Sequence, residues 1–251
     1  MINYITYAGK SLRDFNLYVN GRGTYDAPAK VYTMVEIPGR SGDLAYDEKR
    51  FKNIDVTYPA AFINPGFEDN FYDLRAFLYS FSGYQRLEDT YHPDEFRMAI
   101  YKDGLNVKNM DMLNMFGTFD LVFHCKPQRF LKIGETSVYF SSSGTINNPT
   151  NYESKPLIKV TVSSSSTDRT FGIGSETITV SNPIGASVFY IDCESMDAYY
   201  LTSGTPSARY PINNKVTFSS YNFPVLKPGD NGVSWDSGIA SIEITPRWWT
   251  V

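Results

Sequence analysis

The chain of 251 residues has few cysteines and no long apolar run. Its two cysteines, Cys125 and Cys193, stand far apart in the sequence, which argues against a disulfide framework. No run of about 18 apolar residues occurs, so we expect no membrane-spanning helix and no membrane anchor. The N-terminus lacks the basic start and apolar block of a signal peptide. These absences predict a protein that is made and folded in the cytoplasm.

The sequence also lacks the motifs of common catalytic and nucleotide-binding sites. It contains no Gly-x-Ser-x-Gly elbow, no P-loop, no His-Glu-x-x-His and no Gly-x-Gly-x-x-Gly. Only His92 and His124 can serve as histidine bases or ligands. His124 precedes Cys125, but neighbouring residues of a strand point to opposite faces and cannot readily bind one ion. We therefore predict no catalytic residue, no metal site, no cofactor and no enzyme activity.

The chain has little net charge of either sign. Its 23 Lys and Arg and 27 Asp and Glu give a net charge of −4. Residues 1–134 hold 33 of these 50 charged residues, whereas residues 135–251 hold 33 of the 43 Ser and Thr. This shift in composition predicts two domains, 1–134 and 135–251, with net charges of −1 and −3. Neither has the basic surface that nucleic-acid binding normally needs, so sequence-specific nucleic-acid binding is not expected.

Aromatic residues are abundant, with 19 Tyr and 17 Phe, and they favour sheets and interfaces. In the first domain we expect strands over 4–7, 15–19, 30–36, 53–62, 96–101 and 114–126. The last of these places one set of side chains on a single face: Met115, Phe119, Leu121, Phe123 and Cys125. One segment has a helical period and should form about four turns before Gly83, with these apolar positions: Phe67, Phe71, Leu74, Leu78 and Phe81. The pattern predicts an α+β domain with one amphipathic helix on a β-sandwich.

The second domain has only strand signals. After a stretch rich in Ser, Gly and Asn, 141–151, which we interpret as a linker or long loop, short strands are expected over 157–162, 177–180, 188–192, 216–218 and 239–245. This spacing favours an antiparallel sandwich or jelly roll, so the chain as a whole is mainly β. Near the C-terminus, alternation places Ile242, Ile244 and Trp248 in the core. Trp249 then faces the other way, and we expect it to contact the first domain or an intervening loop.

A charged segment, 84–97, contains Glu88 and Asp94, which could form the carboxylate pair that glycoside hydrolysis needs. A charged edge hairpin or a subunit contact is the favoured interpretation, because carboxylates are common and Arg and Tyr are enriched at interfaces. The residues that this contact would use are Arg86, Glu88, Tyr91 and Arg97.

Another candidate contact is the segment Ile37-Pro-Gly-Arg-Ser-Gly-Asp-Leu44. It neither follows a buried strand nor opens a helix, so a turn is favoured over a phosphate-binding loop. Arg40, Ser41 and Asp43 at its tip could fix the register of an interface through charge pairs.

Aromatic residues of the second domain could form a platform that stacks on sugar faces: Tyr199, Tyr200, Trp235 and Trp249. Ordinary core and domain-contact packing is the favoured alternative, because aromatic rings dominate core burial. Asp192, Glu194 and Asp197 could suggest calcium, but they lack the loop spacing of a dedicated site.

Taken together, six segments resemble the distal tail protein family of long, flexible-tailed phages of Gram-positive hosts. They follow the family's order over nearly the whole chain and include no large insertion of the kind that adds carbohydrate-binding modules to longer members. The segments are 37–44, Glu88-Asp-Thr-Tyr-His-Pro-Asp94, 119–134 with its Cys-Lys-Pro-Gln-Arg-Phe core, Asn148-Pro-Thr-Asn-Tyr152 followed by Ser154-Lys-Pro-Leu-Ile158, 192–199 and 242–249.

The resemblance implies a structural protein of the virion at the distal end of the phage tail. Family members look like hexameric rings, in which a β-rich first domain with one helix surrounds a central channel and a galectin-like β-sandwich hangs outside. The ring joins the major tail protein of the tail tube to the tail-associated tip protein, and its outer domains can hold receptor-binding or baseplate proteins. It thus implies a ring-forming domain over 1–134 and a galectin-like domain over 135–251.

The channel of such a ring would have to pass DNA without binding it. Six copies carry a formal charge of −24 (6 × −4), and a basic lining would hold phosphates through counterion release. We therefore expect neutral or acidic side chains along the channel. The alternative function is a host cell-surface carbohydrate-binding module in the second domain; a wall-degrading hydrolase is disfavoured because no acid–base pair stands out.

Overall fold

The computed structural model describes residues 3–20, 22–63, 67–110, 116–163, 168–182, 184, 186–203 and 208–251. The chain divides into two compact units, Met1–Arg129 with Val251, and Phe130–Thr250. The change of unit between Arg129 and Phe130 lies five residues before the boundary that the composition predicts.

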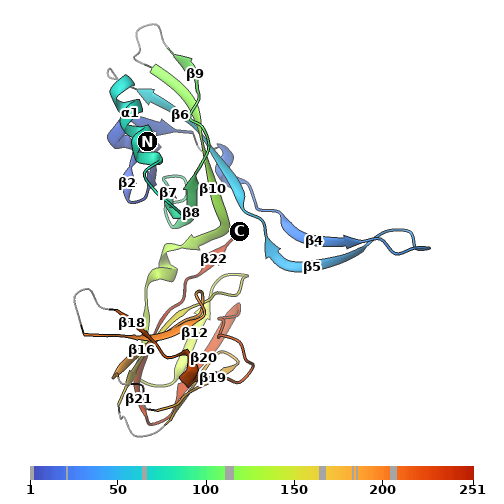
Figure 1. Cartoon of the computed structure of the whole chain (residues 1–251), viewed down its shortest axis with the longest axis vertical. Coiled ribbons are helices and arrows are strands. Elements are labelled where there is room, and N and C mark those ends of the chain that lie inside the picture. Colours follow the sequence, from blue (N-terminus) through green and yellow to red (C-terminus); the bar gives the residue numbers. More distant parts are fainter. Residues whose placement is uncertain are drawn as a thin grey trace. The chain divides into compact units, whose positions relative to one another are not determined.

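The first unit is built on one large antiparallel sheet, with strand order β2-β1-β7-β8-β10-β6-β3; β9 and β22 pair with β10 off this path. The strands are β1 (Ile5–Tyr7), β2 (Lys10–Ser11), β3 (Leu17–Val19), β6 (Ile54–Ile63), β7 (Gln85–Asp89), β8 (Glu95–Tyr101), β9 (Val107–Met110) and β10 (Phe116–Leu131). The residues of β22 (Trp249–Thr250) belong to the second unit. The helical elements are η1 (Leu12–Phe15), η2 (Arg22–Tyr25) and α1 (Phe67–Leu78). Figure 1 shows α1 packed beside this sheet.

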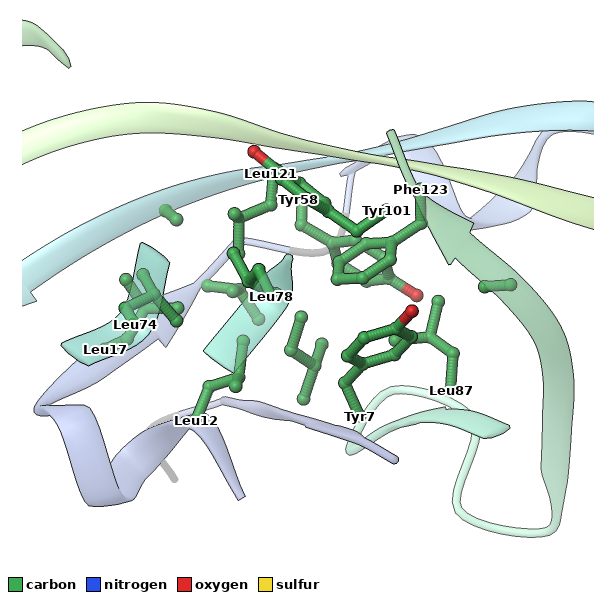
Figure 2. Close-up of a cluster of buried hydrophobic side chains, with 14 of the residues drawn as sticks. Tyr7, Leu12, Leu17, Tyr58, Leu74, Leu78, Leu87, Tyr101, Leu121 and Phe123 are labelled. Atoms are coloured by element: carbon green, nitrogen blue, oxygen red, sulfur yellow. The ribbon is translucent and has the colours of Figure 1, made fainter. Parts of the chain in front are cut away.

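The core of the first unit lies between α1 and the sheet. Phe119, Leu121 and Phe123 alternate along β10 and are fully buried, as the strand pattern predicts. Leu74 and Leu78 of α1 are buried against the same cluster, which Figure 2 shows from within. The helix ends at Leu78, so it is shorter than the four turns expected. Met115 lies outside the described residues.

The strand expected over 15–19 begins later, because a 3₁₀ turn occupies its start. The Ser11 hydroxyl accepts a hydrogen bond from the backbone N–H of Arg13 at 3.3 Å and caps the turn η1. Asn16 ends the turn in the left-handed conformation, with φ of 57°. Only Leu17–Val19 is left to pair with β6.

Two further strands form a separate antiparallel hairpin, which we call the arm. It consists of β4 (Lys30–Val35) and β5 (Leu44–Phe51), which make a two-stranded sheet of their own. Figure 1 shows this ribbon leaving the rest of the first unit. The second strand of the arm was missed by the sequence analysis, because four charged residues interrupt its apolar alternation.

The second unit is a β-sandwich of two antiparallel sheets. The six-stranded sheet contains β11 (Val138–Phe140), β21 (Ile239–Thr245), β13 (Leu157–Val162), β16 (Val188–Asp192), β17 (Asp197–Leu201) and β18 (Arg209–Pro211), in that order. The five-stranded sheet contains β12 (Gly144–Asn148), β20 (Gly229–Trp235), β14 (Arg169–Ile173), β15 (Glu176–Val180) and β19 (Val216–Phe218). Short 3₁₀ turns are η3 (Lys132–Glu135) and η4 (Asn213–Lys215).

The core of this sandwich is formed by alternate residues of both sheets. Phe189 of one sheet and Phe171 of the other are buried, with ring centroids 6.4 Å apart. The predicted core positions Ile242, Ile244 and Trp248 are buried. Mainly β architecture with one α-helix is therefore confirmed for the described part of the chain.

The stretch interpreted as a linker or loop, 141–151, contains a strand. Residues 144–148 form β12 and pair with β20, and Ile146 and Asn148 point inward. The Asn148 side chain donates to the carbonyl oxygens of Tyr152 and Leu226, at 2.9 and 3.0 Å. The sequence analysis missed this strand because Asn148 occupies an inward position where an apolar residue is expected. The buried amide is tolerated there because it is hydrogen-bonded.

Candidate assembly surfaces

The arm exposes large apolar side chains on both faces. Val35, Leu44 and Tyr46 share one face and are 45%, 50% and 64% exposed; Tyr32 and Met34 share the other and are 49% and 57% exposed. A two-stranded hairpin has no second layer that could cover these side chains, and it is marginally stable alone. Exposed apolar hairpins promote association, so this surface is the clearest candidate for a protein contact.

One ion pair and one hydrogen bond between side chains link the two strands of the arm. Lys30 Nζ lies 2.5 Å from Asp47 Oδ2, and this hydrogen bond raises the pKa of Lys30 and lowers the pKa of Asp47. Glu48 accepts a hydrogen bond from Thr33, which lowers its pKa, and it also pairs with Arg50 at 2.8 Å. These exposed pairs fix the geometry of the arm more than they stabilise the fold.

The tip of the arm is the turn predicted over 37–44. Gly39 and Gly42 adopt φ of 81° and 84°, which side chains rarely tolerate, and Arg40 N donates to Ile37 O at 3.1 Å. The residues at this tip are exposed: Arg40, Ser41 and Asp43. The structure therefore brings the three predicted contact residues together beside the apolar faces of the arm.

The second predicted contact, over 84–97, is the β7–β8 hairpin, but it is not at the edge of the sheet. β7 pairs with β1 on one side and with β8 on the other. Arg86 contacts Glu88 and lies 3.8 Å above the Phe96 ring, and Tyr91 donates to the carbonyl of Val19 at 3.2 Å. The edge position was wrong because pairing with β1 depends on residues 80 positions away.

Arg97 of the same group is 6% exposed and lies inside the unit. Its Nη1 and Nη2 atoms have no hydrogen-bond partner among the residues that the structure describes, and burial, together with the nearby charge of Arg129, lowers its pKa. Arg129 in turn donates to the carbonyl of Thr24 and lies 3.4 Å from Glu95. A buried side chain of this kind cannot itself form a subunit contact without rearrangement.

His124 and the two cysteines lie apart from one another in their contacts: His124 contacts a carboxylate, and both cysteines are buried. His124 Nδ1 lies 2.6 Å from Asp55 Oδ1, while Cys125 is buried on the opposite face. Burial raises the pKa of the Cys125 thiol to about 12 and also raises that of Cys193. Within the described residues, no three His, Cys, Asp or Glu side chains are placed to hold a metal ion.

The rings considered for a sugar platform are not brought together. Tyr199 is 5% exposed, stacks on Tyr190 at 5.4 Å and is covered by Arg209, which lies 4.3 Å from its ring. Tyr200 and Trp235 belong to different sheets, and both pack against the sandwich core. The structure thus offers no shared platform of these three rings.

Trp249 contacts the loop that follows β12 within its own unit. Its Nε1 donates to the carbonyl of Glu153 at 2.9 Å, and its ring stacks on Tyr152 at 4.6 Å. A contact of Trp249 with the first domain stays a prediction.

The acidic cluster near residue 192 pairs with an arginine. Asp192 is buried, and its two oxygens accept hydrogen bonds from Arg247 at 2.6 and 3.2 Å. Burial would raise the pKa of Asp192, but the bonds from Arg247 and from the N–H groups of Ser195 and Glu194 bring it below its usual value. This carboxylate joins the end of β16 to the segment after β21.

No helix in the described residues is both long enough and apolar enough to cross a membrane. Sequence comparison finds no matching family model and no matching curated protein. Solved structures do match. The crystal structure of the Dit protein of phage SPP1, described as a paradigm of the hub adsorption apparatus in phages that infect Gram-positive hosts, is 15% identical and covers 100% of both chains with a TM-score of 0.76.

Two structures of the phage P2 baseplate in its activated conformation match more weakly. The one with Ca is 8% identical, with a TM-score of 0.55, and the one with Sr is 7% identical, with a TM-score of 0.53. Each covers 97% of this chain and 98% of the other. At identities of 7–15%, these matches show a shared fold. The match to SPP1 Dit covers the full chain and confirms the resemblance in fold to a distal tail protein.

Proposed function

We propose that the chain is the hub of a phage tail tip, a hexameric ring at the distal end of the tail. The ring joins the major tail protein of the tube to the tail-associated tip protein and carries receptor-binding or baseplate proteins outside. The observation that carries this proposal is the full-length match to the SPP1 hub protein, because both units are shared in the same order. A structural, non-enzymatic role fits this match.

The proposal assigns ring formation to the first unit. The exposed arm supports it, since an isolated apolar hairpin needs a covering partner. Arg40, Ser41 and Asp43 at its tip would set the register of a subunit or tube contact, and Arg86, Glu88 and Tyr91 would lie at a second contact. Complementary charges at such contacts favour one register over others.

Replacing Arg40 by alanine should weaken assembly. An exposed ion pair contributes up to about 1 kcal/mol, and a ring repeats the loss at every contact. We expect Arg40→Ala to shift part of the material from the ring to smaller species in size-exclusion chromatography. Lys227→Ala, an exposed change in the second unit, serves as the control. An unchanged hexamer mass for Arg40→Ala would count against this contact.

The proposed channel should not retain DNA. We expect a neutral or acidic lining, so assembled rings should show no binding to duplex DNA in a mobility-shift assay at low salt. Tight binding that weakens steeply as salt rises would point to a basic lining and contradict the proposal.

The alternative, a host cell-surface carbohydrate-binding module, is favoured by one observation. A hollow of about 330 Å³ at the five-stranded sheet is lined by Thr170, Thr177, Trp235 and Asp236, among others. If this hollow binds sugar, the full chain should bind immobilised host wall glycans and Trp235→Ala should abolish the binding. If the wild-type chain does not bind glycans, the carbohydrate-binding alternative is wrong and the hub function is the remaining proposal.

A further inference from the structure

The outer face of the large sheet has a groove that no segment of the described chain fills. Its volume is about 420 Å³, and strands β3, β6, β9 and β10 line it. The side chains that shape it are Tyr18, Pro59, Ala61, Lys108, Thr118 and Asp120. No residue of the arm from the same chain lines this groove.

The groove follows from the residues that pair across the strands. Tyr18 pairs with Ala61, and Ala61 pairs with Thr118, so the three share the outer face. Their chain neighbours, including Phe119, are buried in the core on the other face. Because Ala61 and Thr118 are short, they leave a hollow beside the exposed ion pair of Lys108 and Asp120.

One face of the arm has the matching features. Tyr32 and Met34 project from it and are about half exposed. Lys30 and Asp47 form an ion pair next to them, and the Lys30 ammonium lies 5.3 Å from the Tyr32 ring. A methionine side chain is unbranched and flexible, so it adapts to irregular apolar hollows.

We propose that this groove receives the Tyr32 and Met34 face of the arm from a second copy of the chain. The inference rests on the proposed hub function and names the contact through which the copies join. The two ion pairs are complementary when they meet in opposite order, with Lys30 facing Asp120 and Asp47 facing Lys108. Such charge pairing fixes the orientation of the arm in the groove.

A second copy is the occupant that satisfies both surfaces at once. Each chain supplies one arm and one groove on the same unit, so an assembly of identical chains contains equal numbers of arms and grooves. The contact joins two different surfaces, and repetition of such a contact gives a ring if the rotation closes and a filament if it does not. In a closed ring every groove is filled and every arm is covered.

The test uses two full-length variants with complementary defects. Ala61→Trp fills the groove and leaves the arm intact, whereas Met34→Asp places a charge on the arm and leaves the groove intact. Ala76→Trp on the exposed side of α1 is the matched control. Thr118→Arg replaces Ala61→Trp if circular dichroism shows that the latter does not fold.

Mass photometry should find each variant alone as a monomer at concentrations where the wild type and Ala76→Trp assemble. An equimolar mixture of the two variants should give a dimer, because one intact arm and one intact groove remain. Assembly of both single variants like the wild type, or a mixture that stays monomeric, would overturn the arm–groove contact. The hub function fails separately, if the wild-type chain is absent from purified phage tails.

Discussion

Asp192 and Gly134, 58 positions apart in the sequence, both hold the segment that follows β21. Asp192 binds Arg247 through two hydrogen bonds, although Arg247 adopts an unfavourable φ of 56°. Gly134 accepts a hydrogen bond from Arg247 N at 2.8 Å and packs directly against Trp248. Together they keep Trp248 in the core of the sandwich.

Replacing Asp192 by asparagine should lower the free energy of unfolding at pH 7 by about 2 kcal/mol, because hydrogen bonds to a buried charged group are lost. The pKa of Asp192 is lowered in the folded state, so its stabilisation is present above the unfolded pKa of about 4. It is lost as the pH falls through the folded value. Urea unfolding at pH 7 and at pH 3 should therefore show a difference from the wild type that shrinks in acid.

The control for this change is Glu194→Gln in the same turn. Glu194 makes an exposed pair with Lys155 at 3.7 Å, so the free energy of unfolding should change by less than about 1 kcal/mol. Equal losses for the two variants at pH 7 would contradict the role given to the buried pair.

Gly134→Ala should destabilise the second unit by about 1–3 kcal/mol, through overpacking. A Cβ atom at this position would lie 2.3 Å from Trp248 N and 3.0 Å from Trp248 Cβ. Gly232→Ala is the control, since a Cβ there meets nothing within 4 Å. Unfolding followed by tryptophan fluorescence should separate the two variants, and similar midpoints would refute the close approach.

The sequence could not have predicted these residue roles. Arg97 was expected in a contact because Arg is common at interfaces, but it is buried by segments that only the fold brings near, including Arg129. Asp192 was weighed as a calcium ligand, and its partner Arg247 lies 55 positions away. The exposure of Arg40, Ser41 and Asp43 could be predicted, because a turn rich in Gly and Pro is exposed wherever it occurs, and their role in a contact stays a prediction.

At the scale of secondary structure, periodicity identified the long elements and missed the short polar ones. Helix α1 and strand β10 were predicted because their apolar positions repeat over many residues. β12 and β14 were missed, since Asn148 and Arg169 occupy inward positions where an apolar residue is expected. Such strands form through pairing with neighbours, which a single sequence does not reveal.

Helix α1 should contribute to stability through one apolar stripe. Leu74 is fully buried between the helix and the sheet, so Leu74→Ala should cost about 2–5 kcal/mol, from lost burial and the cavity it leaves. Tyr72→Ala on the exposed side should cost far less. Guanidinium unfolding curves of the two variants provide the comparison, and equal midpoints would show that α1 does not close the core.

At the scale of the whole molecule, the two units share their fold and order with a phage hub protein at 15% identity. A fold can persist at this identity because burial and pairing patterns are kept while individual residues change. Composition predicted two domains, 1–134 and 135–251, but it gave no basis for predicting how copies of the chain would contact one another. The proposed contacts use the arm, which forms a two-stranded sheet of its own.

The most direct test of the hub account is the mass of the purified full-length chain in solution, measured by light scattering coupled to size exclusion. The account predicts a single species with six times the 28.4 kDa mass of one chain. A mass of one chain at every concentration, including those reached after mixing with purified tail tubes, would contradict it.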